Sequence, residues 1–193
     1  MSKSAIQTLA TPQERGLDVA RQVALVVGAS LFVALGARVT IPLPGTPVPL
    51  TVQNFGVLLV GLLLGSRRGF AALLLYLAEG AVGLPVFSVS TLGLTGIAQI
   101  LGPTGGYLMA YPLAAAAAGY VFERGRKTFA RAAIASLLGD ILLFAGGLAW
   151  LYALTHSLAR AAYLGLYWFV AAEVIKVMFA AAIAVRWRRN AKA

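Results

Sequence analysis

Six long apolar runs, separated by short polar, basic or proline-rich segments, set the pattern of the chain. We predict them to be transmembrane helices over about residues 23–41, 51–66, 69–84, 106–122, 129–154 and 163–186. Several are shorter than the ~20 residues that a straight spanning helix needs, but bilayer thinning or helix packing accommodates short spans. Only a tight basic turn separates the runs 51–66 and 69–84, so one re-entrant unit is an alternative for that pair.

The composition agrees with a membrane protein. Of the 193 residues, 60% are hydrophobic and 11% are charged, with a mean hydropathy of +0.85, whereas about a quarter of the residues in soluble chains are charged. The expected organisation is a cytoplasmic N-terminal tail over 1–22, one transmembrane substrate-binding domain over 23–188 and a cytoplasmic C-terminal tail over 189–193. The chain has no Cys, which excludes disulfides, thiolate metal sites and Cys nucleophiles.

The distribution of Lys and Arg predicts the orientation. The net charge of +10 is gathered in short clusters between the apolar runs, which is typical of membrane topology and not of nucleic-acid binding. With six spans, thirteen basic residues fall on the side of the termini, and only Arg38 and Arg160 fall on the other side. Because Lys and Arg accumulate in cytoplasmic segments, both termini are predicted to be cytoplasmic, with the protein in the inner (cytoplasmic) membrane.

Two connections on the outer side differ from ordinary loops. Residues 41–50 contain four prolines, which exclude a regular helix. Residues 84–104 are apolar and rich in glycine, and they are too irregular to span the membrane. Irregular backbone near a membrane is tolerated where it is buried in protein or lines a cavity. We therefore expect an outer lid loop that covers a pocket.

Glu173 and Lys176 are the strongest indication of a functional site. They lie three residues apart inside the last span, so they share one face of a helix. Lys176 precedes Arg186 by ten residues, which corresponds to ~15 Å and about half of the hydrocarbon thickness. A single charge at that depth costs at least ~3 kcal/mol. The pair predicts a polar ligand site facing the bundle interior; a structural ion pair between helices is the alternative.

Other polar residues lie at the outer ends of the spans. Gln53 and Asn54 open the second span, where they are expected to face a ligand or to cap the helix. Tyr107 follows a glycine-rich turn that either lets backbone N–H groups approach a ligand or simply leads into the fourth helix. Asp140 and Glu79 lie in or near spans, and the sequence assigns them no role.

Small residues in the first span indicate close helix packing. Ser30 and Ala34 form a small-xxx-small pattern, which lets helices approach closely in lipid. The pattern suits either packing within this chain or docking to a partner subunit.

Several catalytic motifs are absent from the sequence. It contains no Gly-Lys-Ser/Thr phosphate-binding loop, no Gly-x-Ser-x-Gly elbow and no His-Glu-x-x-His helix. The one His also argues against a di-His metal centre. We therefore expect neither an enzyme nor a metal or cofactor site.

Five short motifs follow one another along the chain: IPLPG at residues 41–45, PLTVQ at 49–53, GLLLG at 61–65, GLPVF at 83–87 and GPTGGY at 102–107. Their order resembles the BioY family, the biotin-specific S components of energy-coupling factor (ECF) transporters. The resemblance extends from the first span to Lys176. It implies an all-α membrane protein with a six-helix S-component bundle that binds biotin near the outer surface under an outer loop.

The resemblance also implies partners and site residues. S components of this family associate with a transmembrane coupling subunit and two ATPase subunits through small residues of the first helix, which Ser30 and Ala34 match here. Glu173 and Lys176 match an acidic residue, usually Asp, and a Lys that contact biotin. Gln53 and Tyr107 match two further pocket positions.

Biotin's chemistry suits these residues. A carboxylate accepts hydrogen bonds from the ureido N–H groups and an ammonium donates to the ureido carbonyl, while Phe87 is expected to enclose the apolar part of the ligand. The alternatives are an S component for another vitamin, an intramembrane enzyme using Glu173 as a base, and a facilitator that needs no ATPase.

Overall fold

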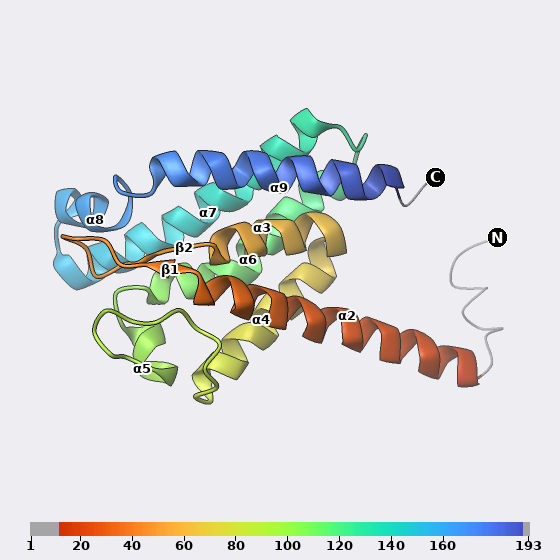
Figure 1. Cartoon of the computed structure of the whole chain (residues 1–193), viewed down its shortest axis with the longest axis horizontal. Helices are drawn as coiled ribbons and strands as arrows, with labels where there is room; N and C mark the ends of the chain where they lie inside the picture. The colour runs from red at the N-terminus through yellow and green to blue at the C-terminus, as the bar shows by residue number, and fades with distance from the viewer. Residues whose placement is uncertain (1–11, 191–193) are drawn as a thin grey trace.

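Helices account for most of residues 12–190, the part of the chain that the computed structural model describes (Figure 1). The longer helices are α2 (Pro12–Arg38), α3 (Gln53–Leu64), α4 (Ser66–Ala81), α6 (Gly105–Glu123), α7 (Phe129–Thr155) and α9 (Val170–Asn190). Two short helices, α5 (Gly96–Leu101) and α8 (Leu158–Gly165), and the strands β1 (Thr40–Ile41) and β2 (Leu50–Thr51) lie between them.

Helix α3 forms the centre of the bundle, because it contacts α2, α4, α6, α7 and α9. Most of its side chains are buried, which agrees with a sequence that is apolar on every face. At Gly61 the backbone of α3 lies so close to α6 that a Cβ atom would overlap the carbonyl oxygen of Ala115. Small residues thus let the central helices pack closely in the absence of a hydrophobic driving force from water.

The first five predicted spans coincide with α2, α3, α4, α6 and α7. Helix α2 begins at Pro12, inside the segment predicted to be the N-terminal tail, and the rest of that tail and residues 191–193 lie outside the described residues. Helices α3 and α4 are joined at Gly65, whose φ of +84° is a conformation that glycine adopts without strain.

The sixth predicted span, 163–186, is wrong as a continuous helix. The chain forms α8, turns at residues 166–169 and continues as α9, with a 55° bend between the two helices. The turn is held by backbone hydrogen bonds from the N–H groups of Leu166 and Tyr167 to the carbonyl of Ala162. Because residues 163–170 are almost entirely apolar, hydropathy alone did not predict the break.

Within residues 12–190, two helical segments are individually long and apolar enough to cross a membrane, Gly16–Arg38 and Phe129–Thr155. The bent pair α8–α9 meets the same criteria only when it is taken as one span. Helix α3 has 12 residues, or ~18 Å at 1.5 Å per residue, against ~30 Å of hydrocarbon. The count of six transmembrane helices therefore stays a prediction.

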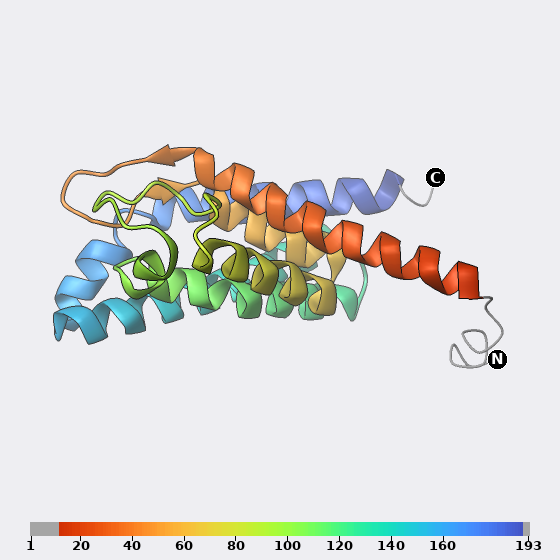
Figure 2. The same cartoon turned by 90° about the horizontal axis from the view of Figure 1, so that it is seen from below.

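The two ends of the bundle differ in character (Figures 1 and 2). One end, which we call the outer end, holds the β1–β2 hairpin, the connection 82–95, α5 and α8. The opposite end, the basic end, holds the α3–α4 and α6–α7 connections and both ends of the described chain. The first turn of α4 carries Arg67 and Arg68 there, and the α6–α7 connection carries Arg124, Arg126 and Lys127.

Two segments at the outer end form a cap over the bundle: the hairpin loop 42–49 and the connection 82–95. The Thr91 hydroxyl donates to the carbonyl of Pro47 (2.9 Å), which ties the two segments together. The Thr46 hydroxyl donates to the carbonyl of Leu164 (2.5 Å), which ties the hairpin loop to α8. The cap corresponds to the lid expected from the sequence, although the antiparallel hairpin within it was not predicted.

Candidate ligand-binding site

The Glu173–Lys176 pair lies in the first two turns of α9, directly after the bend. The Lys176 Nζ atom is 2.6 Å from the Glu173 Oε1 atom, and the two side chains are 12% and 4% exposed. Because Glu173 lies in the first turn, the partial positive charge of the helix N-terminus stabilises its carboxylate. The bend therefore places an ion pair, and the favourable end of a helix, inside the bundle.

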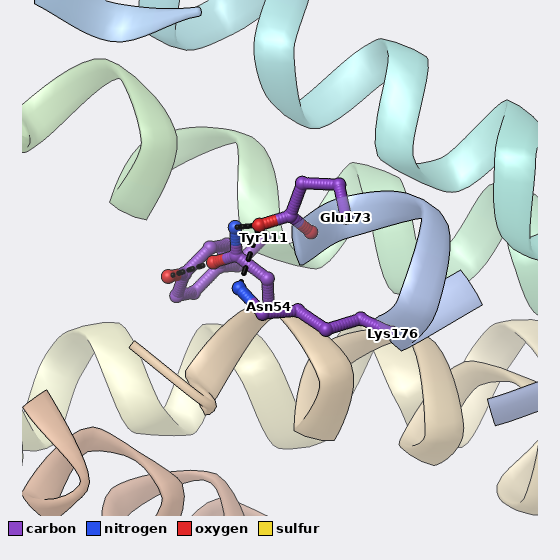
Figure 3. Close-up of polar contacts among 4 residues, drawn as sticks. All are labelled: Asn54, Tyr111, Glu173 and Lys176. Carbon is purple, nitrogen blue, oxygen red and sulfur yellow. Dashed lines mark hydrogen bonds and ion pairs between the residues drawn. The ribbon is translucent and has the colours of Figure 1, made fainter. Parts of the chain in front are cut away.

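Helices α3 and α6 complete a polar cluster around Glu173 (Figure 3). The Asn54 Nδ2 atom donates to Glu173 Oε1 (3.2 Å), and the Tyr111 hydroxyl donates to Asn54 Oδ1 (2.9 Å). Oε1 thus accepts from both Asn54 and Lys176. The other carboxylate oxygen, Oε2, is buried and has no hydrogen-bond partner. An unpaired buried acceptor is costly, so this oxygen is available to a donor from a ligand.

A small cavity of about 30 Å³ adjoins this cluster under the cap. Its walls come from the hairpin, the connection 82–95 and helices α3, α6, α7 and α9, and they include Val48, Ser88, Phe144 and Phe169 together with Asn54, Tyr111, Glu173 and Lys176. A volume of this size accommodates about two water molecules. The cavity therefore has one polar wall, around Glu173, and several apolar ones.

Gln53 and Tyr107 also line this cavity, but both use part of their polar groups in hydrogen bonds to the protein itself. The Gln53 Nε2 atom donates to the Tyr76 hydroxyl (2.6 Å), which donates in turn to the carbonyl of Val86 (3.0 Å). The Tyr107 hydroxyl donates to the carbonyl of Gly165 (2.6 Å) at the end of α8. Tyr107 therefore offers the cavity its ring, while its hydroxyl holds the α8–α9 bend.

The structure does not place Phe87 on the wall of this cavity. Its ring packs edge-on against Tyr76, with centroids 5.4 Å apart, and over Gly80, where a Cβ atom would overlap it. The neighbouring residue, Ser88, lines the cavity instead. The sequence of the connection 82–95 is irregular, so it did not predict which of its side chains face the cavity.

Ser30 and Ala34 are buried inside the bundle and are not available to a partner helix. Ser30 is fully buried, and its hydroxyl donates to the Glu79 Oε1 atom on α4 (3.1 Å). Ala34 is 9% exposed. The packing alternative therefore holds for these two residues, and the docking alternative is wrong for them. Their interior position also gives Glu79 a partner that the sequence did not identify.

A different set of small residues follows the exposed face of α2. They recur every fourth position and are all exposed: Gly16, Ala20, Ala24 and Gly28. A Cβ atom at Gly16 or Gly28 would meet no other atom within 4 Å. We call this set the α2 small-residue face. Its spacing is as visible in the sequence as that of Ser30 and Ala34, but the sequence does not show which of the two faces points outward.

Tyr111 and Asp140 complete the set of polar groups near Glu173. Tyr111 was not predicted, although its spacing of four residues from Tyr107 places both rings on one face of α6. Asp140, on α7, lines an apolar groove together with Glu173 and lies close enough to the Glu173 carboxyl group to interact with it; its Oδ1 atom is buried and accepts from no donor in the described residues. Within residues 12–190, no cluster of three or more His, Asp or Glu side chains is arranged to hold a metal ion.

Comparisons with known proteins agree on one family. Residues 4–193 match the profile of the BioY family. A probable biotin transporter BioY of Pyrococcus horikoshii is 40% identical over 174 residues, covering 89% of this chain and 98% of the relative. The biotin transporter BioY of Thermotoga maritima is 37% identical over 167 residues, with coverages of 84% and 95%. A crystal structure of the S-component for biotin from an ECF-type ABC transporter superposes with a TM-score of 0.80 at 25% identity, covering 93% of this chain and 95% of that one.

Proposed function

Since the chain belongs to the BioY family, we propose that it captures biotin at the outer face of the cytoplasmic membrane as the substrate-binding subunit of an ECF-type transporter. The similarity to the S-component for biotin extends over nearly the whole chain. Relatives named as biotin transporters match 84–89% of this chain over 95–98% of their own length. Biotin is the transported substrate in this proposal, and the chain converts nothing chemically.

The unpaired Oε2 atom of Glu173 beside Lys176 is the observation that carries the proposal. The ureido ring of biotin has two N–H donors and one carbonyl acceptor. Glu173 Oε2 accepts from one N–H group, and Lys176 has donors to spare after pairing with Oε1. Charge-assisted hydrogen bonds of this kind are roughly twice as strong as neutral ones, and the apolar walls formed by Phe144 and Phe169 suit the thioether ring.

Binding requires the cap to move. The cavity measures about 30 Å³, whereas pockets for small-molecule ligands are usually about 300–1,000 Å³. The cap segments 42–49 and 82–95 form its outer wall and are held to one another and to α8 by single hydrogen bonds. Their displacement, with the polar wall on α3 and α9 left in place, opens the site toward the outer side.

The basic end faces the cytoplasm in this proposal. It collects the cationic connections of the chain, whereas the outer end has only Arg38 and Arg160, and segments rich in Lys and Arg stay on the cytoplasmic side. Delivery of biotin then depends on a transmembrane coupling subunit and two ATPase subunits. The α2 small-residue face is the surface that suits close approach of a helix of the coupling subunit.

Binding of radiolabelled biotin to detergent-purified protein tests the function. We expect saturable binding that unlabelled biotin displaces and that thiamine and riboflavin do not. Glu173→Gln should weaken it at least tenfold, because the amide loses the charge that strengthens the hydrogen bonds and replaces one acceptor oxygen by an NH2 donor. Ala159→Gln, an exposed change on α8, is the matched control. Displacement by thiamine or riboflavin instead would identify an S component for another vitamin.

Recovery of the bound ligand separates a carrier from an enzyme. Mass spectrometry of the ligand released after incubation should return unchanged biotin. A converted product would contradict the transport proposal and favour an intramembrane enzyme.

Copurification with a coupling module tests the partner. Gly28→Leu adds a large side chain to the α2 small-residue face without meeting any neighbour in this chain. It should leave biotin binding intact and abolish assembly with the coupling subunit. Val23→Leu, at an exposed position beside that face, is the matched control and should assemble normally. Normal assembly of Gly28→Leu would reject this face as the docking surface.

A further inference from the structure

The guanidinium of Arg38 is a cation without a partner at the outer end of the molecule. Arg38 is the last residue of α2 and is exposed. Within residues 12–190 its side chain makes no hydrogen bond or ion pair, although it lies within electrostatic reach of the Tyr76 hydroxyl. Most cations of the chain lie at the basic end, so a cation at the outer end is an exception to the distribution of Lys and Arg. A role for Arg38 in binding would explain this exception.

Arg38 borders a second pocket, of about 220 Å³, between the end of α2, the connection 82–95 and α5. Polar side chains of Ser88, Ser90, Thr95 and Gln99 share its lining with Phe87 and Leu84. The Gln99 Nε2 atom donates to the carbonyl of Ser88 (2.8 Å), which fixes the wall between the connection and α5. The second pocket is therefore partly apolar, with one cation among its lining residues.

This second pocket adjoins the cavity beside Glu173. Ser88 lines both spaces. Gln53, on the wall of the cavity, is hydrogen-bonded to Tyr76, and Tyr76 packs against Phe87, on the wall of the second pocket. Phe87 and Tyr76 thus pack together between the two spaces, and Ser88 is a wall that both spaces share.

We propose that Arg38 binds the carboxylate of the ligand, with the polar head at Glu173 and the apolar chain running past Ser88 into the second pocket. The inference rests on the proposed function, because biotin combines a neutral ureido head with a carboxylate at the far end of an apolar chain. Near Glu173 the cation Lys176 is already paired, and no second unpaired cation lines that cavity in the described residues. A guanidinium matches a carboxylate with two parallel hydrogen bonds.

The proposal gives Phe87 a place at the ligand. Its ring lies where the apolar chain would pass, in the second pocket and not beside the ureido head. In this arrangement Phe87 encloses the apolar part of the ligand, as expected from the sequence, but from the second pocket and not from the cavity beside Glu173.

A comparison of two ligands on three variants tests the proposal. The ligands are biotin and biotinol, in which an alcohol replaces the carboxylate; the variants are Arg38→Gln, Arg38→Lys and Arg160→Gln. Arg38→Gln should weaken biotin binding by tenfold or more and change biotinol binding by less than twofold. Arg38→Lys should retain part of the preference for biotin, because it keeps the charge. Arg160→Gln, which removes the other outer cation, should change neither ligand.

The outcomes separate this inference from the proposed function. Equal weakening of both ligands by Arg38→Gln, or no weakening of either, overturns the role of Arg38 while leaving biotin as the substrate. Wild-type protein that binds neither ligand overturns the proposed function and this inference with it. An Arg38→Gln variant that fails to fold shows the loss in its melting temperature, and the Arg38→Lys variant then decides by its ratio of biotin to biotinol affinity.

Discussion

At the scale of single residues, the two carboxylate oxygens of Glu173 have different surroundings. Oε1 accepts from Asn54 and Lys176, which holds the side chain in place, while Oε2 is buried and accepts from no N–H donor of the described residues; the carboxyl group also interacts with Asp140 of α7. In the function that we propose, Oε1 thus fixes the position of the group, and Oε2 is the atom that meets the ligand. Rigid support of a functional group by neighbouring side chains is what precise recognition requires.

Removal of Lys176 should affect stability and binding in separable ways. Lys176→Met leaves the buried carboxylate of Glu173 without its ion-pair partner, and we expect a loss of about 3 kcal/mol of folding free energy together with loss of biotin binding. The double change Glu173→Gln with Lys176→Met removes both charges, so stability should return while binding stays lost.

Melting of the purified protein in detergent, followed beside biotin binding, checks this expectation. Melting temperatures that fall equally in the single and double variants would show that the pair does not compensate charge. Biotin binding that survives in the double variant would show that the pair does not recognise the ligand.

Residue types at this site were predictable from the sequence, but their relative placement was not. Glu173 and Lys176 were evident because charged side chains are costly inside a transmembrane helix. Their spacing of three residues also places them on one helix face. Asn54 and Tyr111 join them only through the packing of α3 and α6 against α9, which local spacing does not encode. The place of Phe87 on the second pocket, and not beside Glu173, also depends on tertiary packing.

At the scale of elements, the bend between α8 and α9 determines where the site lies. It places Glu173 in the first turn of a helix, so that the helix N-terminus and Lys176 act on one carboxylate. The bend is stabilised from outside its own sequence, because the Tyr107 hydroxyl on α6 donates to the Gly165 carbonyl. Apolar periodicity locates helices but contains no information on such tertiary contacts, so a single span was predicted.

Close packing of α3 against α6 should depend on the absence of one side chain. Gly61→Ala places a methyl group against the Ala115 carbonyl of α6, so the two helices must move apart. We expect a loss of about 1–3 kcal/mol, the usual cost of overpacking, measured as a lower melting temperature in detergent.

Gly28→Ala is the matched control for this prediction. It adds the same methyl group to a helix at a position where nothing lies within 4 Å, and it should leave the melting temperature unchanged or raise it slightly, because Ala favours helix over Gly. Equal effects of the two changes would mean that the helix propensity, and not the packing, decides the outcome.

At the scale of the whole molecule, the positions of charged connections predict how the protein sits in the membrane. The native chain has no Cys, so single cysteines report their own accessibility. Arg126→Cys at the basic end should react with a membrane-impermeant maleimide only after the cells are opened, and Ala159→Cys on α8 should react in intact cells. The reverse pattern of labelling would overturn the orientation, and labelling of both in intact cells would show a leaky preparation.

A covalent link across the cap should block entry of the ligand. Pro47→Cys with Thr91→Cys joins the two cap segments at the point where the Thr91 hydroxyl meets the Pro47 carbonyl. Under oxidising conditions the association of labelled biotin should slow at least tenfold and recover after reduction. Each single cysteine variant is the control and should bind at the normal rate in both conditions. Unchanged association in the oxidised double variant would show that the ligand enters by another route.

A closed cap over so small a cavity changes what limits the capture of a scarce vitamin. If the ligand enters only when the two cap segments separate, the opening rate of the cap limits association. The observed association rate then rises with ligand concentration until it equals this opening rate, and stays constant at higher concentrations. A seated molecule leaves only when the segments part again, so slow parting of the ligand-bound protein would lengthen the time for which the vitamin is retained. Such a transporter binds its vitamin no faster when the vitamin is abundant, but it retains a bound molecule for longer when the vitamin is scarce.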